Sequence, residues 1–352
     1  MKTNIMIINL QLFALTSNGV NATVASGSMG ALNAQGTYFA PNTDLSAEMK
    51  TFYDMTLIDE ASANLVHDQF GQKRPIPKNG GKTIEFRKFA PLAKATAPLV
   101  EGVTPSGKSL KVTAVTATPN QYGDFIMQSD VLELTALDNT ILEATKLLGR
   151  QAGATLDTVV REVLQGTPNV TYCPKVVDGV ETEVKSRDAL DTTSQLTVKV
   201  IQQVVAKLRG QNAPTINGKY VAIIHPYVAY DLMRDPEWID AHKYTTSTNL
   251  YEGEIGEIAG VRFVQTTEAK VYEGGIFGTL VFGEGAYGVT EITGGGLETI
   301  VKQKGSAGTA DPLDQRSSIG WKAIKTAELL IPNYIVRVES KSAAFSATTS
   351  AN

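Results

Sequence analysis

The chain has 352 residues, of which 42% are hydrophobic and 19% charged, with a net charge of −4. This is the composition of a globular protein with two or three structural units. One cysteine, Cys173, excludes an internal disulfide framework, and a pI near 5.6 argues against a protein that coats nucleic acid.

The N-terminal segment, residues 1–45, has two interpretations. Lys2 followed by the apolar run Ile5–Leu15 is the pattern of a cleaved signal peptide. However, polar residues such as Asn9 interrupt that run, and residues 16–44 are rich in Ser, Thr, Asn, Gly and Ala. We favour a flexible arm. The signal peptide remains the basis of an alternative, a secreted or surface-layer structural protein.

A helix over about 46–68 is predicted next, and it is followed by a strongly basic segment at residues 70–127. This segment has nine basic and three acidic residues, a net charge of +6. We expect its cations to lie at contacts between subunits, and the residues concerned are Lys73, Arg74, Lys82, Arg87, Lys88, Lys94, Lys108 and Lys111.

Two runs within 70–127 alternate apolar and polar residues with the period of a strand. Ile84 and Phe86 share one face of the first run, and Leu110, Val112 and Ala114 share one face of the second. We therefore predict an extended β-hairpin. Because a two-stranded ribbon is too narrow to bury its own apolar face, we expect a neighbouring copy of the chain to cover it.

The helix-period patterns come next. Ser129-Asp130 starts a short helical turn, and a helix of roughly 40 Å is expected over about 138–165, where apolar residues recur at three- and four-residue steps. A hairpin around Asp178-Gly179, a helix from Thr197 and a buried strand at Tyr220–Ile224 follow.

Beyond Thr266 the chain is mostly strand and glycine turn, and the tail Lys341–Asn352 is expected to be frayed. The class is α+β. The predicted strands of this part are Thr279–Phe282, Tyr287–Ile292, Glu298–Gln303, Ser318–Leu330 and Tyr334–Ser340.

Two glycine motifs suggest nucleotide binding, and the sequence around each opposes it. Gly102–Ser109 matches the phosphate-binding loop, but the residues after it alternate like a strand where a helix is required. Gly283–Gly288 matches the dinucleotide fingerprint, but it too leads into a strand. A nucleotide-dependent enzyme is thus a disfavoured alternative.

The isolated polar residues do not form a catalytic constellation. We interpret His225 as a structural residue at a strand–helix corner, His67-Asp68 as a solvated helix end, and Cys173 as an inert thiol. Glu252, Glu254 and Glu257 are interpreted as an acidic turn. We therefore predict no enzyme activity, cofactor or metal site.

Charge is distributed unevenly along the chain. Residues 226–300 contain twelve acids and four bases, a net charge of −8. Together with the basic segment, this suggests complementary faces that meet between copies. Two other interpretations stay open: unrelated solvated surfaces, and a basic arm that grips DNA.

In the order of several short motifs, the chain resembles the major capsid proteins of tailed bacteriophages, which have the Hong Kong 97-like fold. Within that group it is most similar to the N4-type branch. The resemblance covers nearly the whole chain beyond residue 45. The motifs that carry it are Glu101–Pro105, Gln121–Gly123, Ser129-Asp130, Leu156-Asp157, Ala213-Pro214, Tyr220–Pro226, Asp235–Trp238, Gly253–Gly256, Gly260–Phe263, Gly320–Lys322 and, near the start, Asn9–Ala14.

The resemblance implies a self-assembling, non-enzymatic shell protein. Its implied parts are a flexible N-terminal arm (1–45), an extended β-hairpin loop (70–127), a peripheral domain (46–69, 128–194 and 317–345) with the spine helix, an axial domain (195–316) and a tail (346–352).

The resemblance also implies the assembly and its partners. Hexamers and pentamers would tile an icosahedral head around double-stranded DNA, with no membrane and no sequence-specific DNA binding. The other expected partners are a separate scaffolding protein, a portal and a decoration protein. Assembly would take place in the host bacterial cytoplasm.

Overall fold

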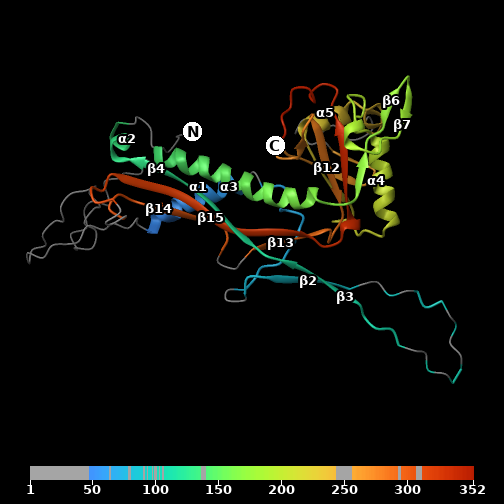
Figure 1. Cartoon of the computed structure of the whole chain (residues 1–352), viewed down its shortest axis with the longest axis horizontal. Helices are drawn as coiled ribbons and strands as arrows, with labels where there is room; N and C mark the ends of the chain where they lie inside the picture. Colours follow the sequence, from blue (N-terminus) through green and yellow to red (C-terminus); the bar gives the residue numbers. More distant parts are fainter. Residues whose placement is uncertain are drawn as a thin grey trace, which may run out of the picture.

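The structure, a computed structural model, describes most of the chain, in the ranges 47–62, 65–77, 81–89, 107–135, 140–242, 256–291, 295–306 and 311–352, with residues 92, 94–96, 98, 101–102 and 104. The N-terminal arm and the signal-peptide alternative lie outside the described residues. Helices and sheets are mixed, as predicted (Figure 1). Among the described helices, none is long and apolar enough to cross a membrane.

One layer is a five-stranded sheet organised by the long strand β15 (Arg316–Leu329). Strands β13 (Tyr287–Glu291) and β14 (Glu298–Lys302) pair with successive parts of β15, and the short β1 (Gln72–Lys73) extends β13. The opposite edge of β15 pairs with β4 (Asn120–Ser129). The prediction that the arm extends to residue 127 is therefore wrong, because β4 belongs to this sheet.

The helix α3 (Thr140–Gln165) lies over the sheet, and α1 (Ala47–Ser62) packs beside it (Figure 1). Leu148 and Leu156 are spaced by whole turns of α3 and are buried with Trp321 of β15. The long helix thus matches its predicted bounds. The short helix α2 (Asp130–Thr135) precedes it, and Ser129 Oγ accepts a hydrogen bond from the Leu132 amide at 3.3 Å.

The second layer is a seven-stranded sheet covered by three helices, α4 (Val198–Gly210), α5 (Pro226–Met233) and α6 (Pro236–His242). Its strands run in the order β5-β16-β12-β8-β10-β9, with β11 beside β12. Their bounds are β5 Val170–Tyr172, β8 Tyr220–Ile224, β9 Glu257–Ile258, β10 Val261–Gln265, β11 Val271–Tyr272, β12 Ile276–Phe282 and β16 Ile335–Lys341.

The C-terminal end of α3 joins the two layers. Val160 and Leu164 are buried in one cluster with Leu280 of the seven-stranded sheet and Tyr287 of the five-stranded sheet. The sheets do not follow the expected boundary of the axial domain, residues 195–316. Strands β13 and β14 lie within that range but belong to the five-stranded sheet, whereas β16 lies beyond it and belongs to the seven-stranded sheet.

Two separate ribbons project from these layers (Figure 1). The first contains β2 (Ile84–Phe89) and β3 (Val112–Ala117), and we call residues 73–118 the arm. The second pairs β6 (Lys175–Val177) with β7 (Val180–Thr182). Its turn has the predicted residues, Asp178 and Gly179, at positive φ of 51° and 78°.

The C-terminal tail is packed, so the prediction that it is frayed is wrong. Ser346 Oγ donates to the Gly275 carbonyl at 2.7 Å, and Asn352 Oδ1 accepts from the Val271 amide at 2.9 Å. The ring of Phe345 stacks on Tyr227 with 4.2 Å between centroids. Small polar residues suggested disorder, but they fit closely against this surface. The structure also contains the short 3-10 helices η2 (Arg187–Ala189) and η4 (Pro332–Tyr334).

Candidate subunit interface

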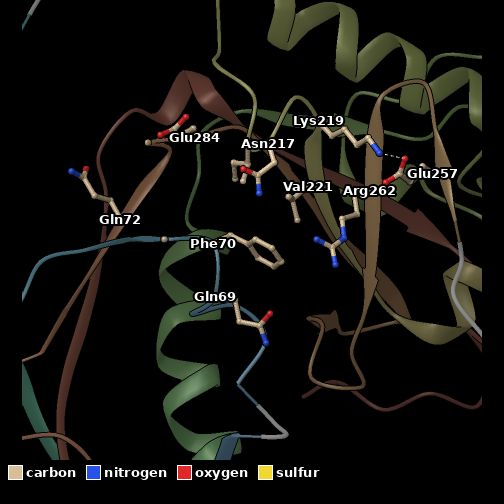
Figure 2. Close-up of a pocket in the computed structure, with 12 residues that line it drawn as sticks. Gln69, Phe70, Gln72, Asn217, Lys219, Val221, Glu257, Arg262 and Glu284 are labelled. Atoms are coloured by element: carbon tan, nitrogen blue, oxygen red, sulfur yellow. Dashed lines mark hydrogen bonds and ion pairs between the residues drawn. The ribbon is translucent and has the colours of Figure 1, made fainter.

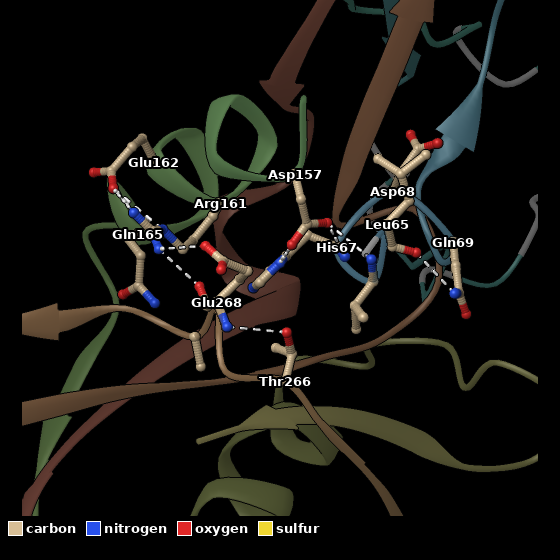
Figure 3. Close-up of polar contacts among 12 residues, drawn as sticks. Leu65, His67, Asp68, Gln69, Asp157, Arg161, Glu162, Gln165, Thr266 and Glu268 are labelled. Atoms are coloured by element: carbon tan, nitrogen blue, oxygen red, sulfur yellow. Dashed lines mark hydrogen bonds and ion pairs between the residues drawn. The ribbon is translucent and has the colours of Figure 1, made fainter. Parts of the chain in front are cut away.

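The segment that leads into the arm is anchored on the long helix (Figure 3). Asp157 of α3 accepts hydrogen bonds at Oδ1 from the backbone amides of Val66 and His67, at 2.9 and 2.7 Å. Its Oδ2 lies 2.6 Å from Nδ1 of His67, and both side chains are fully buried. The prediction of a solvated helix end at His67-Asp68 is therefore wrong.

A second set of contacts fixes the same segment to the sheet. The carboxylate of Asp68 lies 3.1 Å from Nζ of the buried Lys325 in β15 and 3.6 Å from Nζ of Lys73. The hydroxyl of Tyr287 donates to the His67 carbonyl at 2.5 Å, and burial raises the pKa of this tyrosine well above its usual range. The base of the arm is thus held by both α3 and the five-stranded sheet.

The register of the arm places its apolar residues on opposite faces. Val115 lies opposite Phe86 and Ala117 opposite Ile84, so these four share one face. Val112 and Ala114 lie on the other face, both exposed. The two predicted apolar runs therefore do not form a single stripe.

The body of the same chain covers one of these faces. Phe86 is only 4% exposed and packs on Gly288 of β13, where an added Cβ would lie 2.7 Å from the ring. The expectation that a neighbouring copy must cover this face is wrong. Cover by a neighbouring copy stays a prediction for the distal part of the arm, where Leu110 is 67% exposed.

The eight predicted contact residues occupy different environments. Lys73 and Arg74 lie at the arm base, where the Arg74 amide donates to the Val289 carbonyl at 3.1 Å. Arg87 is 4.0 Å from Glu85 and exposed. Lys108 also has an interaction within the chain. Of these eight residues, Lys82, Lys94 and Lys111 are exposed and form no ion pair with another described residue. The side chain of Lys88 lies outside the described residues.

The structure agrees with the rejection of both glycine motifs. The residues after Ser109 enter strand β3, whereas a phosphate-binding loop must be followed directly by a helix. Gly283–Gly288 spans the turn after β12 and the first two residues of β13, so a strand follows this motif as well. Neither segment has the strand–loop–helix geometry that holds a phosphate.

His225 and Cys173 have the structural environments that were expected. The Nδ1 of His225 accepts from the Tyr227 amide at 3.2 Å and caps α5, and burial lowers the pKa of this histidine to about 4. Cys173 is fully buried, and burial raises the pKa of its thiol far above the usual range. Of the predicted acidic turn, Glu252 and Glu254 lie outside the described residues. Glu257 forms an ion pair with Lys219.

Several acids of residues 226–300 have partners within the chain. Glu298 lies 3.1 Å from Lys322, and Glu268 lies 4.0 Å from Arg161. Asp235 accepts the Val198 amide at the start of α4, at 2.9 Å. The net charge of −8 therefore overstates the acidic surface that this part of the chain offers to a partner.

A different acidic surface was missed by the sequence analysis. We define the β4–α2 corner as residues 120–145, whose sequence contains five acids and no base, one of the acids being Glu143, which pairs with Lys146 at 2.8 Å. Asp124 accepts from Gln151 Nε2 at 2.6 Å and Asp130 from the Val131 amide at 2.8 Å, and both donors are neutral. The corner also exposes large apolar side chains, those of Phe125, Met127, Val131, Leu132 and Leu134. A charge count over 120–145 alone would have identified it.

An open pocket of about 750 Å³ lies between the base of the arm and the seven-stranded sheet (Figure 2). Phe70 and Arg262 point into it, and the Lys219–Glu257 ion pair lies at its side. Its described lining contains no histidine, cysteine, serine or threonine. Among the described residues, no cluster of acidic, histidine or cysteine side chains could hold a metal ion.

Comparison with known proteins identifies the family. Residues 23–284 match a family described as phage capsid protein. No curated protein matches the chain. The family match covers most of the sequence, including the arm, α3 and most of the seven-stranded sheet.

Solved phage capsids have a similar fold. The capsid of Ralstonia phage GP4 shares 12% identity with a TM-score of 0.58, covering 92% of this chain and 98% of that chain. The capsid of cyanophage Pam1 shares 12% identity with a TM-score of 0.60, covering 89% and 98%. The capsid of cyanophage P-SCSP1u shares 14% identity with a TM-score of 0.59, covering 79% and 88%. The chain therefore belongs to the phage capsid protein family, and it is a major capsid protein, the subunit of a phage shell.

Proposed function

We propose that this shell subunit has the Hong Kong 97-like arrangement and assembles into hexamers and pentamers of an icosahedral head. In this proposal α3 is the spine helix and the β2–β3 arm is the extended loop. The similarity of the fold to solved phage capsids supports it. The family match gives no support to the secreted or surface-layer alternative.

The observed sheets lead us to redraw the proposed domains. The peripheral domain contains α1, α3 and the five-stranded sheet, so it includes β13 and β14. The axial domain contains α4, α5 and the seven-stranded sheet, so it includes β5 and β16. Residues 1–45 form the proposed N-terminal arm.

The observation that carries the assembly proposal is the exposed distal part of the arm. Leu110 and Val112 are 67% and 50% exposed, so no other element among the described residues covers these two apolar side chains. Covering roughly 500 Å² of such surface contributes about 12 kcal/mol before ordering costs. Repeated around a ring, one such contact per subunit favours closed assembly. In this proposal the cations of the arm, from Lys73 to Lys111, lie at the contact.

A shortened arm tests this role. Residues 90–111 are replaced by Asn-Gly, which joins Phe89 to Val112, the last pair of the ribbon, through a two-residue turn. The variant keeps the buried Phe86 and Ala117. We expect a folded subunit that forms no shells, seen by circular dichroism and negative-stain microscopy. Normal shells from this variant would refute the role given to the arm.

The proposal has further parts. The subunit acts without enzymatic activity or a cofactor, and the head encloses double-stranded DNA without reading its sequence. A separate scaffolding protein, a portal and a decoration protein are the proposed partners, and the host cytoplasm is the proposed place of assembly. The N4-type branch is the proposed affiliation.

A further inference from the structure

The pocket between the base of the arm and the seven-stranded sheet has an apolar floor that the fold itself builds. Val221 of β8 is 2% exposed, and the ring of Phe70 is backed by Phe282, with 6.1 Å between the ring centroids. The neighbouring Gly71 approaches β13 closely, because an added Cβ would lie 2.6 Å from a tyrosine ring of that strand. The floor is thus formed before any ligand binds, as is usual for binding sites.

One cation on the wall of this pocket has no carboxylate partner among the described residues. Arg262 of β10 is exposed and forms no ion pair with another described residue. Glu257 lies directly opposite Arg262 in the β9–β10 ladder, but its carboxylate pairs with Lys219. In Figure 2 the side chains of Arg262 and Phe70 extend toward each other from opposite sides of the pocket. A guanidinium and an apolar surface therefore face the same space.

These groups select the chemistry of a ligand. The planar fork of an arginine matches a carboxylate or a phosphate, since each accepts two parallel hydrogen bonds. Two acids, Glu257 and Glu284, also line the pocket, and they oppose a dianionic phosphate more strongly than a single carboxylate. The apolar floor favours a large apolar group close to that carboxylate. The ligand class is therefore a carboxylate with an apolar neighbour.

The shape of the pocket and the rest of its lining favour a peptide. The pocket is open, whereas sites for small molecules bury most of the ligand surface. Three exposed amide side chains, those of Gln69, Gln72 and Asn217, add both donors and acceptors to the lining. Such groups suit the alternating N–H and C=O groups of an extended backbone. An open pocket also lets a chain continue past it, so the carboxylate belongs to an aspartate or glutamate side chain.

The N-terminal segment of this chain is a less suitable occupant. Residues 1–46 contain a single acid, Asp44, which stands next to Leu45. However, Asp44 lies three residues before α1, and α1 packs against α3 through Leu57. An acid so close to a packed helix has no extended chain on its C-terminal side, so a second protein is favoured.

We propose that this pocket binds an extended segment of a second protein, in which an aspartate or glutamate stands next to a large apolar residue. Arg262 binds the carboxylate, and Phe70, Ile216 and Val221 contact the apolar side chain. The inference goes beyond the proposed shell function. It does not depend on the role of the arm between subunits, because the whole pocket lies within one molecule.

Peptide binding to the unassembled subunit tests the proposal. The probe is a fluorescein-labelled peptide, Gly-Ser-Asp-Leu-Phe-Ser-Gly with an amidated C-terminus, and fluorescence anisotropy measures its dissociation constant. One comparison peptide replaces Asp by Asn, and the other replaces Leu-Phe by Gly-Gly. We expect each change to weaken binding to the wild type by roughly tenfold.

Two arginine variants locate the site. Arg262→Gln should weaken binding of the Asp peptide by roughly tenfold and should bind the Asp and Asn peptides equally. Arg209→Gln is the matched control, because Arg209 is an exposed arginine of α4 outside the pocket lining, and it should bind like the wild type. Both positions are exposed, so both variants should melt within a few degrees of the wild type.

Several results would overturn the proposal. They are no binding of the probe to the wild type, equal affinity for the Asp and Asn peptides, and unchanged binding by Arg262→Gln. A labelled single-stranded oligonucleotide that binds more tightly than the probe, and only when Arg262 is present, would assign the pocket to nucleic acid. Tighter binding of a peptide of residues 40–48 would assign it to a second copy. None of these measurements reads shell formation, so the shortened-arm variant tests the proposed function separately.

Discussion

The base and the distal part of the arm differ in what they contact. Near the base, Phe86 packs on Gly288, and the preceding segment is held by Asp157 and Lys325. Further out, Leu110 and Val112 have no such cover. The same two-stranded ribbon is therefore part of the folded subunit at one end and an exposed binding element at the other. Substitutions at the base should change folding, and those in the distal part should change assembly.

The largest effect on folding is expected at Asp157. Replacing it by alanine leaves the amides of Val66 and His67 and the buried His67 ring without an acceptor, which should cost about 3 kcal/mol of unfolding free energy. Urea denaturation of the unassembled subunit measures this change. Glu143→Ala is the control on the same helix, because Glu143 forms only an exposed ion pair with Lys146. Equal stabilities of the two variants would contradict the anchoring role.

A smaller effect is expected at Phe86. Truncation to alanine removes a buried ring from the arm base, and since the ribbon can relax, we expect a loss of about 2 kcal/mol. Gly288→Ala should act in the same direction, because its Cβ would push against that ring. Limited proteolysis of the unassembled subunit should cut both variants faster within residues 73–118. An unchanged cleavage rate would mean that the arm is not fixed at its base.

A pH-dependent effect is expected at His225, far from the arm. Its folded-state pKa of about 4 lies below the usual value of about 6.5, so the unfolded chain takes up the proton first as the pH falls. Stability is therefore lost between about pH 6.5 and 4. His225→Asn keeps an acceptor for the Tyr227 amide and does not titrate. The variant should lose less in melting temperature between pH 7 and 4.5 than the wild type, and an equal loss would exclude His225 as a source.

The smallest effect on folding is expected in the distal arm. Leu110→Ser with Val112→Ser removes two exposed apolar side chains, which should change the unfolding free energy by less than about 0.5 kcal/mol. The same variant should fail to form shells, which sedimentation would show. A destabilised subunit would place these side chains in a contact within their own molecule.

Local patterns predicted most of the elements. The bounds of α3, the cap at Ser129, the turn at Asp178-Gly179 and the strand-forming nature of Leu110–Thr118 all depend on residues within a few positions of one another. The two glycine motifs were rejected on the same local grounds. Helices, strands and turns can be predicted from a single sequence because the interactions that determine them join residues close together in the chain.

Other features depend on residues far apart in the chain. The pairing of His67 with Asp157 spans 90 positions, and no periodic pattern connects them. The assignment of β4 to β15 in place of the arm, and the packing of the small polar tail, were decided by which surfaces meet after folding.

The sequence alone determined the mixed class, the long helix and a basic ribbon unable to pack on itself along its whole length. Tertiary structure decided which end of the ribbon is covered, because Gly288 offers the close approach that Phe86 requires. It also decided which acidic residues stay available to a partner, since ion pairs within the chain neutralise several of those in residues 226–300 but not Asp124 or Asp130. Local secondary structure is determined by neighbouring residues. Which surfaces are covered and which charges are paired depends on the whole fold.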